Sequence, residues 1–69
     1  MEAEALAKQI ETILLSQFGH NVINLRVRII ESGLVLEGTI GTYHGKQLAQ
    51  HVAKRVSNLI ITANNIHVR

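Results

Sequence analysis

Sixty-nine residues are enough for one small domain, 1–69, and too few for a large buried core. The chain is 46% apolar and contains no cysteine, which excludes disulfide bonds and thiolate metal sites. Its formal net charge is +2, and all five acidic residues precede position 38, so the second half offers unopposed cations to anionic partners.

The first segment predicts an amphipathic helix. From Glu2 to Phe18 apolar residues recur at three- and four-residue steps, and Gly19 then supplies a stop. Leu15 falls opposite the apolar stripe, so we expect it to be exposed. No apolar run approaches the about 20 residues that cross a bilayer, so no transmembrane segment is predicted.

Two alternating segments follow and predict a β-hairpin. The first runs from Val22 to Glu31 and the second from Leu34 to Ile40, with Ser32-Gly33 as the turn. In the first strand the residues expected to face the core are Ile23, Leu25, Val27 and Ile29.

A turn made of Ser32 and Gly33 fixes the register of this hairpin. The expected pairs are Ile29 with Leu36, Val27 with Gly38, Leu25 with Ile40, Arg28 with Glu37 and Arg26 with Thr39. Gly38 opposite Val27 would let a helix approach the sheet closely.

A second helix and a third strand complete the chain. Thr42 is a candidate N-cap for a helix that ends near Ser57-Asn58. The polar flank of this helix gathers His44, Gln47, His51, Lys54 and Arg55. The third strand, roughly Ile61 to Val68, turns Ile66 and Val68 toward the core and Asn65, His67 and Arg69 away from it.

These elements predict an α+β fold, a two-layer αββαβ sandwich in which two helices cover one face of a three-stranded mixed sheet. The other face of the sheet is then open to solvent. The side chains expected on this open face are Arg26, Arg28, Glu37, His67, Arg69 and an apolar pair, Ile30 and Val35.

A search for catalytic or metal-binding groups finds no workable constellation. The chain lacks Asp, which excludes a Ser-His-Asp triad, and Glu31 and Glu37 fall on opposite hairpin faces. His44 and His51 share a helix flank but lie two turns apart, about 10.5 Å, too far for one metal ion. We therefore expect neither enzymatic activity nor a metal or cofactor.

Nucleic-acid binding is a third alternative that rests on charge alone. Gly38-Thr39-Ile40-Gly41 has the G-x-x-G spacing of a KH-type loop, but it lies in a strand instead of between two helices. The stacking aromatics of an RRM are missing, because Phe18 and Tyr43 are the only aromatic residues.

Three segments carry a family resemblance: LVLEGTI at 34–40, LAQHVAKRV at 48–56 and ANNIHV at 63–68. In the order αββαβ they make nearly the whole chain resemble a BON domain. Asn58-Leu59 stands where the family usually has Gly-Val. The resemblance implies a non-catalytic module of bacterial envelope and stress-response proteins, proposed to bind phospholipid membranes.

We therefore expect a binding module that contacts an anionic phospholipid surface or an acidic protein. The residues expected to make this contact are Arg26, Arg28, Lys46, Lys54, Arg55, His67 and Arg69. The competing interpretation is that these charges only solubilise the domain.

Self-association is the alternative function. It would use the open sheet face or a free edge strand, with Ile30 and Val35 as its apolar centre. The sequence contains no signal peptide. The expected compartment is therefore the bacterial envelope or periplasm if the chain is a mature or excised domain, and the cytoplasm if the chain is complete.

Overall fold

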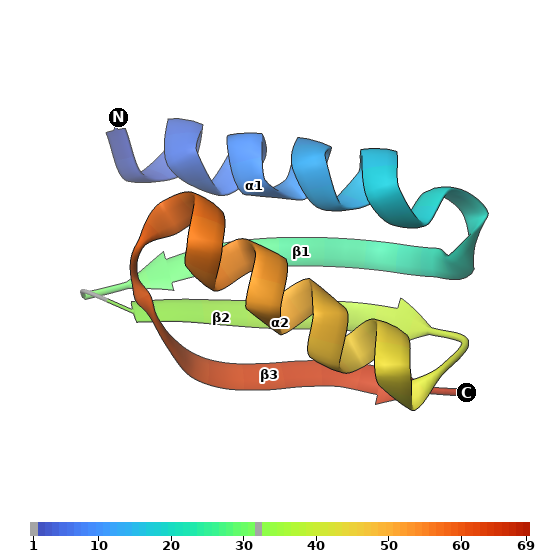
Figure 1. The fold of residues 1–69 in the computed structure, drawn as a ribbon. Helices are drawn as coiled ribbons and strands as arrows, with labels where there is room; N and C mark the ends of the chain where they lie inside the picture. The colour runs from blue at the N-terminus through green and yellow to red at the C-terminus, as the bar shows by residue number, and fades with distance from the viewer. Residues whose placement is uncertain (1, 32) are drawn as a thin grey trace.

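The computed structural model describes residues 2–31 and 33–69 and shows the predicted α+β fold. The elements in chain order are α1 (Glu2–Phe18), a 3-10 turn (Gly19–Asn21), β1 (Val22–Ile30), β2 (Gly33–Ile40), α2 (Tyr43–Ser57) and β3 (Ile60–Val68). The strand order is β1-β2-β3, with β1 antiparallel and β3 parallel to the central β2 (Figure 1). Helix α2 is the crossover that a parallel pair requires.

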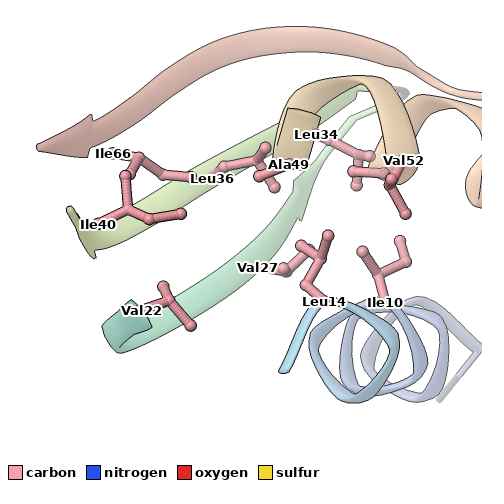
Figure 2. Packing of buried hydrophobic residues seen from close by; sticks show 11 residues of the cluster. Ile10, Leu14, Val22, Val27, Leu34, Leu36, Ile40, Ala49, Val52 and Ile66 are labelled. Atoms are coloured by element: carbon pink, nitrogen blue, oxygen red, sulfur yellow. The ribbon is translucent and has the colours of Figure 1, made fainter. Parts of the chain in front are cut away.

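Both helices cover the same face of the sheet and enclose one aliphatic core between the two layers. Figure 2 shows side chains of α1, α2 and the strands pointing toward one another. The fully buried large side chains are Ile10, Leu14, Leu34, Leu36, Ile40 and Ile66. Half of these come from β2, because the central strand is covered on both sides by its neighbours and on one face by both helices.

A β-bulge in β1 changes which residues face the core. Asn24 and Leu25 together stand opposite Gly38, and Asn24 has a φ of 56°. One extra residue reverses the alternation before it, so Val22 is buried and Ile23 is 42% exposed. The prediction that Ile23 faces the core is therefore wrong, while Val27 is buried as expected.

The hairpin register also differs from the prediction. Gly33 is the first residue of β2 and pairs with Ile30, so it is not a turn residue as predicted; the other predicted turn residue, Ser32, lies outside the described residues. The observed pairs include Val27 with Leu36, Ile29 with Leu34, Arg28 with Val35 and Arg26 with Glu37. Because the partners shift by two residues, every residue after the bulge keeps its predicted face.

Two glycines explain this register. A Cβ at Gly33 would collide with the Thr62 hydroxyl of β3, so any other residue would force the Thr62 side chain to move where Thr62 adds an extra residue to the β2–β3 pairing. Gly38 has a φ of 144°, and a Cβ there would lie 3.1 Å from the Leu25 Cα. Its role is thus to accommodate the bulge, and the prediction that it pairs with Val27 is wrong.

The ends of α2 confirm the expected helix signals. The Thr42 hydroxyl accepts a hydrogen bond from the Gly45 amide at 2.9 Å. Asn58 adopts the left-handed conformation at the other end, with φ 60° and ψ 22°, and its amide donates to the Lys54 carbonyl. Asparagine thus performs the capping for which glycine is usually chosen.

Candidate anion-binding surface

The structure divides the predicted basic residues between two sides of the molecule. Lys46, Lys54 and Arg55 belong to α2, in the helix layer. Arg26, Arg28 and His67 belong to the sheet, where their register positions place them toward the open face, and Arg69 follows directly after β3. A single flat partner therefore cannot contact both groups at once.

A groove of about 390 Å³ follows α2 beside the free edge of β3. Six of its lining residues come from α2 and one from β3: Tyr43, Lys46, Gln47, Gln50, His51, Lys54 and Asn64. Lys46, Gln50 and Lys54 form one row at four-residue steps, and Tyr43, Gln47 and His51 form the next. We call this surface the α2 flank; over the helical rise its two lysines stand about 12 Å apart along the axis.

Asn64 fixes the groove by joining β3 to α2. Its side-chain amide donates to the Lys46 carbonyl and to Gln50 Oε1, both at 3.1 Å. Its Oδ1 accepts a hydrogen bond from the Ile66 amide at 3.2 Å. The other inward-facing positions of β3 are apolar. A single asparagine among them is the sequence signal that would have predicted the contact between Asn64 and α2.

The charges of the α2 flank have no carboxylate to oppose them. Residues 38–69 contain no Asp or Glu. Among the described residues, the ion pair found joins Arg28 Nη2 to Glu37 Oε2 at 3.0 Å, on the open sheet face. Among the described residues no ion pair therefore engages the lysines of α2, whereas Arg28, one of the two arginines of β1, is paired with Glu37.

The C-terminal turn of α2 extends the same surface. His51, Lys54, Arg55 and Asn58 surround a shallow depression of about 430 Å³. Cations here also interact favourably with the negative end of the helix dipole, which is their structural role irrespective of any ligand. Of the predicted polar flank, Gln47, His51, Lys54 and Arg55 line these two depressions and His44 lines neither, while Tyr43, Gln50 and Asn64 are additions.

Only one residue of the apolar pair predicted on the open face, Ile30 and Val35, is exposed there. Ile30 is 43% exposed, but Val35 is only 4% exposed, because it lies in the central strand between Arg28 and Ala63. The exposed companion of Ile30 is Ile60 of β3, at 64%. Ile60 was not predicted because the third strand was expected to begin one residue later.

Each edge strand has one outward amide bonded to a side chain. Glu11 of α1 accepts a hydrogen bond from the Val27 amide of β1 at 3.0 Å. The Asn64 side chain likewise accepts a hydrogen bond from the Ile66 amide of β3. Together with the bulge in β1, these contacts obstruct strand addition at both edges.

No cluster of three side chains able to ligate a metal ion occurs among residues 2–31 and 33–69. Nor is any helix in this part of the chain long and apolar enough to cross a membrane. What the α2 flank offers is a row of ammonium, amide and imidazole groups, which suits an anion or a surface of anions.

Comparison with known proteins adds no family assignment: no protein-family model matches the chain, and no curated protein sequence matches it. The likeness to BON domains therefore stays a prediction based on the three segments described above.

Proposed function

We propose that the chain is a non-catalytic binding module whose α2 flank contacts anionic phospholipid surfaces, the class of partner that the BON resemblance implies. The observation that carries this proposal is the charge of Lys46 and Lys54 in the groove beside β3, extended by Arg55 at the end of α2, in a half of the chain that lacks acidic residues. Tyr43, 64% exposed in the same groove, adds an aromatic ring of the kind that settles at headgroup level.

The contact is weak and depends on salt. Each Lys or Arg near an anionic leaflet contributes about 1 kcal/mol, so the three α2 cations supply about 3 kcal/mol. Screening shortens the reach of these charges to about 8 Å at physiological ionic strength. Binding should therefore be measurable at low salt and should fall steeply as salt is raised.

Co-sedimentation with liposomes tests the proposal. Wild type should pellet with phosphatidylcholine vesicles that contain phosphatidylserine and should stay in solution with phosphatidylcholine alone. Lys46→Glu/Lys54→Glu should bind at least about thirtyfold more weakly, because losing the two lysines alone removes about 2 kcal/mol and the added carboxylates are repelled. The matched control is Arg26→Glu/Arg28→Glu, which makes the same change in net charge on the opposite side.

Equal loss of binding in both variants would show that net charge alone attracts the domain, and the α2 flank would have no special role. If wild type shows no lipid-dependent pelleting, phospholipid is rejected as the partner. The same variants assayed with a single-stranded oligonucleotide and with a polyglutamate peptide then distinguish nucleic acid and an acidic protein from lipid.

A further inference from the structure

The open sheet face has a regular pattern of rows running across its three strands. At the hairpin end Ile30, Gly33 and Ile60 lie side by side in register. The next row is Arg28, Val35 and Ala63, and the one after it is Arg26, Glu37 and Asn65. Farther along, Ile23, Thr39 and His67 form a fourth row.

Apolar residues on this face gather at both of its long margins. Ile30 and Ile23 on β1 are 43% and 42% exposed, and Ile60 on β3 is 64% exposed. These isoleucines lie in strands, and both helices of the described residues cover the other face of the sheet (Figure 1). Ile30 and Ile60 lie in one row on either side of Gly33, and this exposed apolar pair is the candidate contact point for a partner.

Charge is distributed asymmetrically over the same face. Both arginines lie on β1, the glutamate lies on the central β2, and β3 presents Ala63, Asn65 and His67. Consider a second copy related to the first by a two-fold axis that lies between the two sheets and runs parallel to β2. This operation places β3 of the second copy over β1 of the first. Arg26 then faces the partner's Asn65, and the two copies of Glu37 near the axis are flanked by the arginines of both chains.

We propose that two chains associate through their open sheet faces about this two-fold axis, with Ile30 of each packing on the partner's Ile60. The arrangement puts the row of Ile30, Gly33 and Ile60 on the partner's copy of that row and keeps arginine away from arginine, while Ile23 faces the partner's His67. It is isologous, as a closed dimer requires. The strands of the two sheets run nearly aligned, which is a standard packing for sheets face to face.

The size of the face sets the strength of the association. Strands of nine residues are about 30 Å long, and three strands are about 14 Å wide, so each copy offers about 400 Å². Stable complexes bury about 800 Å² per partner. The dimer should therefore be weak, reversible and dependent on concentration. Edge-to-edge pairing is the less favoured route, because Glu11 and Asn64 cap amides at the two edges.

The two-fold also positions the α2 flanks. Each sheet carries its helices on the outer side of the pair, so the two flanks face in opposite directions. This step rests on the proposed contact with phospholipid. If that contact holds, the two α2 flanks of a dimer bind two different anionic surfaces, and the dimer bridges them. Vesicles should then aggregate at protein concentrations where the dimer forms.

Sedimentation velocity over a concentration series tests the dimer without any lipid. Wild type should shift from monomer toward dimer. Ile30→Lys and Ile60→Glu should each stay monomeric, and an equimolar mixture of the two should recover the dimer, because the lysine introduced in one chain then faces the glutamate introduced in the other. Circular dichroism of each variant checks that it is folded. As a folded control, Gln47→Lys on the α2 flank should dimerise like wild type.

Wild type that remains monomeric at millimolar concentration would overturn the proposal. So would dimers of Ile30→Lys that match wild type, or a mixture no more dimeric than its components. Vesicle turbidity is measured separately on wild type and on Ile60→Glu. If wild type pellets with vesicles but does not aggregate them, bridging is rejected and phospholipid binding stands. If wild type dimerises but does not pellet with vesicles, phospholipid binding is rejected and the dimer stands.

Discussion

Asn64 connects the fold of this chain to its candidate site. It occupies a core-facing position of β3, between residues whose side chains pack under α2, yet it carries an amide. Three hydrogen bonds satisfy that amide: two reach α2 and one returns to the amide of Ile66 in its own strand. One residue therefore holds the groove at a set width and covers part of the β3 edge.

Replacing Asn64 by alanine should lower the free energy of unfolding by about 1–2 kcal/mol, since partly buried hydrogen bonds contribute about 1 kcal/mol each and the Lys46 carbonyl keeps its helical partner. Urea denaturation measures the change. Asn65→Ala is the matched control, because Asn65 is exposed and its change should stay within about 0.5 kcal/mol. Equal effects at the two positions would contradict the role given to Asn64.

At the scale of the elements, most of the fold could be predicted from the sequence. The apolar period of α1, the Thr42 cap and the alternation of β2 are local signals, and local signals decide where elements begin and end. The bulge was missed because Val22 and Ile23 are both β-branched and apolar, so either can face the core. Only pairing with Gly38 across the sheet decides between them.

The candidate site was predictable to the extent that it lies on one helix. The steps between Gln47, His51 and Lys54 place them on a common flank, and the structure confirms that they line one groove. The opposite wall required knowing that β3 lies beside α2, which is tertiary information. Likewise, Val35 looked like an exposed residue in the alternation and is covered because its strand is central.

Gly38 provides a test of the bulge. An alanine there must adopt a φ of 144° and bring its Cβ to 3.1 Å from the Leu25 Cα, so Gly38→Ala should destabilise the domain by about 1–3 kcal/mol. Gly41→Ala is the control, since the nearest atom to a Cβ there is an arginine side chain at 3.7 Å. If thermal unfolding shows the two variants equally stable, the bulge is not formed as described.

For the whole molecule, the two-layer arrangement separates two surfaces of different character. The helix side carries the polar and cationic α2 flank together with the acidic residues of α1, and the sheet side has exposed isoleucines at its margins with an internally paired charge. The two proposed contacts should therefore respond to salt in opposite ways. Screening weakens attraction to an anionic surface but relieves repulsion between two positively charged copies.

Raising sodium chloride from low to high ionic strength should thus release the protein from phosphatidylserine vesicles while leaving dimerisation unchanged or slightly stronger. Co-sedimentation and sedimentation velocity in the same buffers give the two curves. Parallel loss of both with salt would indicate that a single charged surface serves both contacts, contrary to the separation of the two faces.

The most direct test of the central claim is to locate the lipid-binding surface residue by residue. Amide resonances of isotope-labelled wild type are recorded while vesicles containing phosphatidylserine are added in small amounts. We predict that broadening begins along α2, at its cap Asn58 and at Asn64, and spares Arg26, Arg28 and the rest of the open face. Broadening that begins on β1 and β2, or that is uniform over the chain, would contradict the assignment of the α2 flank.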